Sequence, residues 1–338
     1  MAEDMITRRQ FIQCTAVAGA GLVGAGIIGL SGCQNETETG PTFACLERDE
    51  SSLAQGAPAI DPQLLTYREI DPIATGLAQP RGLALGPDGR LHIVGDQVIR
   101  IFEQNGSSPY EVRLGSAPQA LAVADDDTIY VAMLGHIEVY TPDGTHRASW
   151  QSAGERAYFT SVAVAGENVW VADAGGRVVR RYDKSGQVRG QIGKKNEARH
   201  IPGLVVPSPH LNVLAGPDGL IWVNNCGRHA VETYTVDGDL TSSWGQPSLN
   251  IEGFCGCCNP TNIALLPDKK IVTSEKGLPR VKVYWPDGTL ESVVAGPEAF
   301  ASRVVGLDLA VDAAGRVMVL DPAAKTVRSF ERRNEAAA

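Results

Sequence analysis

Short runs of alternating apolar and polar residues, separated by turns that contain glycine, follow one another along the chain from about residue 64. Alternation with a period of two is typical of β-strands, whose successive side chains point to opposite faces. Several runs end in Asp-Gly or a related turn, as at 81–89, 211–219 and 309–315. Glycine supplies the positive φ that a tight hairpin requires. The pattern predicts an all-β protein made of consecutive antiparallel hairpins.

A second turn gives this pattern its period. It contains a glycine each time, at Gly106, Gly144, Gly186, Gly238 and Gly288. Periods of about 40 to 50 residues with four strands each are typical of the blades of a β-propeller. With the final copy at 309–330, these turns predict six blades. That copy ends before a fourth strand can form, so we expect a strand at 65–73 to complete the last blade and close the ring, which removes its exposed edges.

The residues within the copies resemble NHL repeats, most clearly at 219–238 and at 280–288. The resemblance extends over about four-fifths of the chain. It implies that residues 64–333 form a six-bladed β-propeller of the NHL type. It implies much less about activity, because propellers of similar shape serve unrelated functions.

The N-terminus has the three parts of an export signal. Arg8 and Arg9 precede Phe11, an apolar run rich in glycine and alanine follows, and the run ends in Leu-Ser-Gly before Cys33. The arginine pair resembles the twin-arginine signal of bacteria, and the residues up to Cys33 resemble a lipobox, which implies that this cysteine is acylated. We therefore expect residues 1–32 to be a cleaved signal. The alternative is an uncleaved membrane anchor, since the run is just long enough to span a bilayer.

The segments on either side of the propeller are predicted to lack packed structure. Residues 33–63 are polar, contain proline and glycine and show no period, which predicts a flexible tether. Residues 334–338 are expected to be a disordered tail. The expected location is the bacterial periplasm or cell envelope, with the membrane as a partner through lipidated Cys33. Nucleic acid is not expected as a partner, because the net charge is −9 and no basic stripe follows the first residues.

The cysteines are the main candidates for chemistry. Three of the seven stand within four positions, at Cys255, Cys257 and Cys258, and Gly256 frees the backbone to bring their sulfurs together. In a propeller blade, the loop before the inner strand and the bend between the second and third strands lie on the same face. Cys226 falls in such a bend of the fourth blade, and the other three precede the fifth. We therefore expect the four sulfurs to meet.

This cluster has three interpretations. Cys226, Cys255, Cys257 and Cys258, with His210 as a further ligand, are suited to an iron–sulfur, zinc or copper centre. In an exported protein the same thiols are also explained by disulfides, including a bridge between the adjacent Cys257 and Cys258. Free thiols engaged in redox exchange are the third interpretation. Setting aside the signal and lipid-site cysteines leaves five, so one is unpaired whichever bridges form.

The same geometric rule places further polar residues on this face. They are candidates for binding a ligand, and comprise His200, Arg81, Glu275, Lys276 and Arg280. Arginine and lysine side chains in such positions favour an anion pocket.

Together these features favour an envelope-anchored propeller lipoprotein whose cysteine-rich face is a metal-binding or redox module, with a protein or redox partner on that face. A disulfide-stabilised scaffold that binds a protein or another ligand is the alternative. An enzyme is less favoured, and its activity stays undecided. Amidating lyases of similar shape hold zinc on histidines that follow proline, and only Pro209-His210 matches. Lactonase-like propellers hold calcium, for which Asn212, Asn262 and Asp308 would serve.

Overall fold

The computed structural model of the chain describes residues 56–333, apart from residues 105, 108 and 302–304. The predicted export signal, Cys33 and the tail at 334–338 lie outside the described residues. Within the described part of the chain, no helix is long and apolar enough to cross a membrane.

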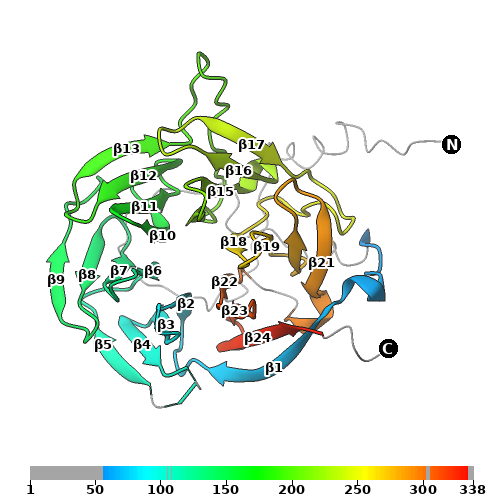
Figure 1. The fold of residues 1–338 in the computed structure, drawn as a ribbon, viewed down its shortest axis with the longest axis horizontal. Helices are drawn as coiled ribbons and strands as arrows, with labels where there is room; N and C mark the ends of the chain where they lie inside the picture. Colours follow the sequence, from blue (N-terminus) through cyan, green and yellow to red (C-terminus); the bar gives the residue numbers. More distant parts are fainter. Residues whose placement is uncertain (1–55, 105, 108, 302–304, 334–338) are drawn as a thin grey trace, which may run out of the picture. The chain divides into compact units, whose positions relative to one another are not determined.

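The described residues form six four-stranded antiparallel sheets arranged in a ring (Figure 1). This confirms the predicted all-β, six-bladed β-propeller. We number the blades from the one that begins with β2. From innermost to outermost strand, the sheets are β2 (Pro80–Leu85), β3 (Leu91–Gly95), β4 (Val98–Phe102), β5 (Tyr110–Arg113); β6 (Ala120–Val123), β7 (Ile129–Ala132), β8 (Ile137–Tyr140), β9 (His146–Ser149); β10 (Phe159–Ala165), β11 (Asn168–Asp173), β12 (Val178–Asp183), β13 (Val188–Ile192); β14 (Val213–Ala215), β15 (Ile221–Asn225), β16 (Ala230–Tyr234), β17 (Leu240–Trp244); β18 (Asn262–Leu265), β19 (Ile271–Ser274), β20 (Val281–Tyr284), β21 (Leu290–Ala295); and β22 (Asp308–Val311), β23 (Val317–Asp321), β24 (Thr326–Arg332), β1 (Tyr67–Ala74).

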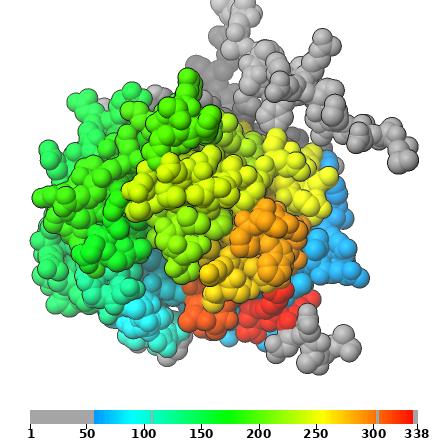
Figure 2. Space-filling model, turned by 45° about the horizontal axis from the view of Figure 1, so that its top comes forward, coloured from blue at the N-terminus to red at the C-terminus, as the bar shows by residue number. Residues whose placement is uncertain are grey.

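The sixth blade is completed by the strand that comes first in the chain. β1 pairs with β24 in antiparallel register, from Tyr67 opposite Arg332 to Ala74 opposite Thr326. Figure 2 shows the start of the described chain, in blue, beside its end, in red. The predicted closure of the ring is confirmed, and the sixth sheet gains its outer strand as expected.

The described residues also form three short 3-10 helices. η1 (Pro62–Leu64) precedes β1, η2 (Cys226–Arg228) lies between β15 and β16, and η3 (Pro297–Ala299) lies between β21 and β22. η1 falls in the last part of the predicted tether, where Asp61 accepts a hydrogen bond from the backbone of Gln63. Leu65 then forms an isolated bridge with Val293 of β21. The residues just before β1 therefore lie against the fifth blade.

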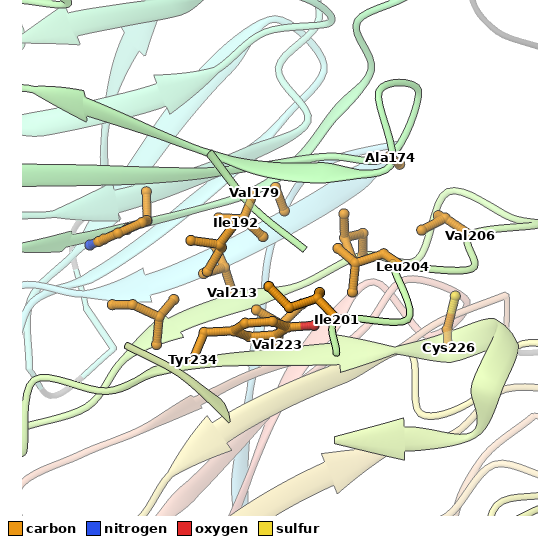
Figure 3. Close-up of a cluster of buried hydrophobic side chains, with 14 of the residues drawn as sticks. Ala174, Val179, Ile192, Ile201, Leu204, Val206, Val213, Val223, Cys226 and Tyr234 are labelled. Atoms are coloured by element: carbon orange, nitrogen blue, oxygen red, sulfur yellow. The ribbon is translucent and has the colours of Figure 1, made fainter. Parts of the chain in front are cut away.

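The hydrophobic core lies between neighbouring blades, which pack face to face. Val179 of the third blade and Val213 and Val223 of the fourth share one buried cluster (Figure 3). The second strand of the fourth blade is covered on both sides, and every residue of β15 is buried. Burying apolar surface in this way stabilises the fold by about 25 cal/mol per Å².

The repeated turn glycines have the conformation that the sequence predicts. All five have φ between 75° and 90°. At Gly288 a Cβ atom would also lie 2.7 Å from Cγ of Trp244 in the preceding blade. A side chain at this turn would therefore be strained and would collide with its neighbour.

Candidate functional site

The cysteine-rich loop lies on the face where the inner strands begin. It connects β17 to β18 and meets η2, which forms the bend between β15 and β16 of the fourth blade. His229, the residue after η2, donates a hydrogen bond of 2.8 Å from Nε2 to the carbonyl oxygen of Gly256 in the loop. Gly256 has a φ of 71°, so the predicted need for a flexible residue between the cysteines is met there.

Three sulfurs come together at this junction. Sγ of Cys257 lies 3.3 Å from Sγ of Cys258, and the side chain of Cys258 is in hydrogen-bonding contact with that of Cys226. We call Cys226, Cys257 and Cys258 the thiol cluster. Cys226 and Cys258 are fully buried, and Cys257 is half-buried. Figure 3 shows Cys226 at one end of the buried cluster that also holds Val206.

The ammonium group of Lys276 lies beside the thiol cluster. Nζ of Lys276 lies 3.9 Å from Sγ of Cys257. A cation at this distance stabilises a thiolate, which is the nucleophilic form of cysteine. By contrast, the contact with Cys226 is the largest of the influences that together raise the pKa of Cys258 to about 12. At neutral pH the buried Cys258 is therefore a protonated thiol.

Cys255 is turned toward a different set of partners. Its backbone N–H donates a hydrogen bond of 2.8 Å to Glu275. Burial, followed by the charge of Glu275, raises the pKa of the Cys255 thiol to about 12. The expectation that all four sulfurs meet closely enough to share a metal ion is corrected here, because Cys255 contacts Glu275 and no such group forms among the described residues.

The four-cysteine metal centre is not assembled in this arrangement. Among residues 56–333 as described, no group of three or more His, Cys, Asp or Glu side chains is placed so that it could hold a metal ion. Cys255 contacts the carboxylate of Glu275 instead of completing such a group. The residues as placed do not fit the expected iron–sulfur, zinc or copper centre.

Glu275 forms a buried ionic group with two cations. Its carboxylate lies 2.7 Å from the guanidinium of Arg280 and 2.8 Å from the ammonium of Lys282, and all three side chains are buried. Burial alone would raise the pKa of Glu275, but Lys282 and Arg280 hold it below its ordinary value. Burial lowers the pKa of Lys282 to about 8.

The two cations also secure the loop before the cysteines. Arg280 donates to the carbonyl oxygen of Leu249 at 3.1 Å and to that of Gly253 at 3.2 Å. Lys282 donates to the carbonyl oxygens of Ile251 and Gly253. Glu275 and Arg280 were predicted to bind a ligand, and the structure instead gives them internal partners. A ligand at either residue would have to displace these contacts.

Asn259 fixes the other end of the cysteine loop. Its side-chain amide donates to the carbonyl oxygens of Cys255 and Lys276, and its Oδ1 accepts from the backbone N–H of Lys276. The sequence pattern did not single out Asn259. The signal available for Asn259 was its place between the cysteines and an inner strand.

His210 lies on the same face, near the centre of the ring. Its carbonyl oxygen accepts a hydrogen bond from the side chain of Asn224, which also donates to the carbonyl oxygen of Pro260 in the next blade. Burial, followed by the positive charge of Lys276, lowers the pKa of His210 to about 3. The imidazole of His210 is therefore neutral, and none of its described contacts is with a sulfur.

The structure does not bring His200 and Arg81 to the thiol cluster. His200 is exposed, and its neighbour Arg199 binds Asp239 in the turn before β17, at the outer edge of the fourth blade. Arg81 is exposed at the start of β2 and donates to Gln119 of the second blade. Their predicted roles in ligand binding remain predictions.

The side chains proposed for a calcium ring bind one another and the backbone. Asn212 donates to Asn262 at 2.8 Å, and Asn262 donates to the carbonyl oxygen of Leu307 at 2.9 Å. Asp308 accepts from the backbone N–H of Leu83 and of Leu309, and burial raises its pKa to about 6. These contacts join the inner strands around the ring.

Comparison with known proteins supports the fold. No protein-family model and no curated protein matches the chain. Virginiamycin B lyase from Staphylococcus aureus is similar in structure, with a TM-score of 0.56, 13% identity, and coverage of 79% of this chain and 99% of the lyase. The WD40 propeller domain of Doa1 gives a TM-score of 0.55, 15% identity, and coverage of 77% and 81%. A Bacteroides thetaiotaomicron protein of unknown function gives 0.57, 14%, and coverage of 82% and 74%. At such identities these similarities show the propeller fold alone.

Proposed function

We propose that this protein is a thiol–disulfide redox module, held at the bacterial cell envelope by a lipid on Cys33. The observation that carries the proposal is the 3.3 Å separation of the Cys257 and Cys258 sulfurs, with a half-buried sulfur beside a lysine and a buried sulfur behind it. This is the arrangement that a dithiol needs to exchange electrons with a partner disulfide.

The exchange has two steps. The Cys257 thiolate attacks one sulfur of the partner disulfide, which forms a mixed disulfide and releases the first partner sulfur as a thiolate. Cys258 then gives up its proton and attacks the Cys257 sulfur, which releases the second partner sulfur. The module gains one disulfide, and the partner gains two electrons and two protons. In the reverse direction the oxidised module oxidises a partner dithiol.

Positioning of the loop supports this function. His229 holds Gly256, and Asn259 joins the cysteine loop at Cys255 to the backbone of Lys276. The ionic group of Glu275, Arg280 and Lys282 holds the preceding residues. A fixed loop keeps the two sulfurs at reacting distance and reduces the conformational entropy lost on forming the bond. A metal centre would require Cys255 to leave Glu275, so redox exchange is the function that the placement of the sulfurs favours.

Oxidation of the purified, reduced protein by glutathione disulfide tests the proposal. Mass spectrometry of the non-reduced peptides is expected to show one disulfide within the thiol cluster, which mild dithiothreitol removes while the protein stays folded by near-UV circular dichroism. Failure of any disulfide to form there would overturn the redox function. A bond that can be reduced only after unfolding would favour the disulfide-stabilised scaffold.

Envelope anchoring is tested separately. We expect Cys33→Ala to move the protein from the membrane fraction to the soluble fraction of the producing bacterium, because the acylated sulfur is lost. Replacement of Arg8 and Arg9 by lysine is expected to retain the chain in the cytoplasm. Unchanged membrane attachment of the Cys33→Ala protein would contradict lipid anchoring and favour an uncleaved anchor.

A further inference from the structure

We propose that Cys258 is the shared sulfur of two alternative disulfides, so that oxidation begins at Cys257–Cys258 and ends at Cys226–Cys258. The inference rests on the redox function proposed above, and it adds a third thiol that receives the bond. Three observations carry it: unequal access to the three sulfurs, the contacts of Cys258 with both other sulfurs, and the ammonium of Lys276 beside Cys257.

Cys257 is exposed to solvent to a greater extent than the other two cysteines of the thiol cluster. Cys226 and Cys258 each have 0% exposed surface, whereas Cys257 is half-buried at the surface. An external disulfide can therefore reach only Cys257 directly. A bond between Cys226 and Cys258 has to be made from within the protein, through Cys257.

Cys258 contacts both other members of the thiol cluster. It lies 3.3 Å from Cys257 in its own loop and contacts Cys226 in the bend of the fourth blade. Cys226 is set in η2, whose next residue, Gly227, donates a backbone hydrogen bond to Val205. The two possible partners thus approach Cys258 from neighbouring blades.

The transfer of the disulfide needs no external oxidant or reductant, because one disulfide forms as another breaks. The Cys226 thiol loses its proton to water and attacks the Cys258 sulfur of the Cys257–Cys258 bond. A Cys226–Cys258 bond forms, and Cys257 leaves as a thiolate beside the ammonium of Lys276, 3.9 Å away. No electrons are gained or lost in this step. The lysine favours the step in this direction because it stabilises the departing thiolate.

The product differs from the first disulfide in two ways. It joins the fourth blade to the fifth, and it is buried where a small external thiol cannot attack it directly. Cys257 is restored as the accessible thiol. The module would therefore hold an oxidising equivalent that is released through Cys257 while the protein stays folded, whether the reductant is a partner dithiol or dithiothreitol.

The test compares oxidation by glutathione disulfide in the full chain and in single variants, with acid quenching at successive times. In the wild type we expect glutathionylated Cys257 or Cys257–Cys258 first, and Cys226–Cys258 later. Cys226→Ala should stop at the first pair. Cys257→Ala should form Cys226–Cys258 at least tenfold more slowly, because the accessible thiol is missing. Cys255→Ala is the matched control and should oxidise within twofold of the wild-type rate.

The outcomes separate this inference from the broader function. Formation of Cys226–Cys258 in Cys257→Ala at the wild-type rate would overturn the relay, as would reversible formation of Cys257–Cys258 with Cys226 never bonded; in both cases the redox function stands. Absence of any disulfide in the wild type would overturn both. Near-UV circular dichroism of each reduced variant identifies one that has failed to fold, and Cys226→Ser then replaces Cys226→Ala.

Discussion

In the third and fifth blades, an acidic residue paired with an arginine holds the loop before the inner strand. The two loops differ in length and in the residues that they carry. In the third blade Asp173, the last residue of β11, accepts from the backbone N–H of Tyr158 at 3.0 Å and pairs with Arg180 at 2.7 Å. In the fifth blade Glu275, just after β19, accepts from Cys255 and pairs with Arg280. An acidic residue at the end of the second strand thus binds the loop in each case.

The two blades differ in what the acidic residue has to hold. The Arg180 side chain keeps 23% of its surface exposed, whereas that of Arg280 keeps 3% and that of Lys282 keeps none. The third blade has a short loop and one cation. The fifth has a long loop with a row of carbonyl groups, and its second cation binds two of them. The fifth blade therefore adds a second cation, Lys282, to the contact between acid and arginine that both blades share. This cation binds the loop that carries the thiols.

The largest expected effect is the loss of the acidic residue in the fifth blade. Glu275→Gln leaves two buried cations without a counter-charge, and we expect it to lower the free energy of unfolding by about 3 to 5 kcal/mol. Asp173→Asn keeps most of its hydrogen bonds and leaves one partly hydrated cation, so we expect a loss of about 1 to 2 kcal/mol. Urea unfolding measures both. Equal losses would show that the two blades do not differ in the way described.

A smaller effect concerns the second cation, which has no counterpart in the third blade. The pKa of Lys282 is lowered to about 8 in the folded protein, mainly by burial. Between about pH 8 and 10 the unfolded chain binds this proton and the folded chain releases it, so stability should rise with pH over that window. Relative to Lys282→Met, we expect the wild type to gain about 2 kcal/mol. A constant difference between the two proteins would contradict a titrating Lys282.

The smallest effect concerns the residue after each acid. Ala174 follows Asp173 as Lys276 follows Glu275, so Lys276→Ala gives the fifth bend the residue of the third. We expect the rate of alkylation of Cys257 by iodoacetamide at neutral pH to fall about fivefold, because the thiolate loses its neighbouring cation. Lys194→Ala, at an exposed site outside the thiol cluster, is the control. An unchanged rate in Lys276→Ala would remove the lysine from the proposed chemistry.

The repeated parts of the fold were predictable from the sequence, because each blade has the same order of alternating strands and glycine-containing turns. The turn glycines, the six blades and the closing strand were predicted in this way and are confirmed. Bends and leading loops of neighbouring blades were predicted to lie on one face. This correctly placed Cys226 beside Cys257 and Cys258, although they are far apart in sequence.

The orientation of individual side chains was not predictable in the same way. Cys255 stands two residues from Cys257, yet it faces Glu275, because a buried carboxylate in another segment binds its backbone. Lys282 lies between two valines and resembles a solvent-facing residue in an alternating strand. It is fully buried because a neighbouring loop covers it and offers carbonyl oxygens. Such contacts depend on the whole ring and leave no local pattern.

Ring closure also sets the order in which the protein can mature. Glu69, in the first strand, binds Arg328, which is 259 positions later in the chain. During synthesis the first strand leaves the ribosome long before its partner exists, so the sixth blade is completed only after β24 has been synthesised. A nascent chain that stalls before β24 keeps an unpaired strand edge, which makes the incomplete product prone to aggregation and a substrate for chaperones.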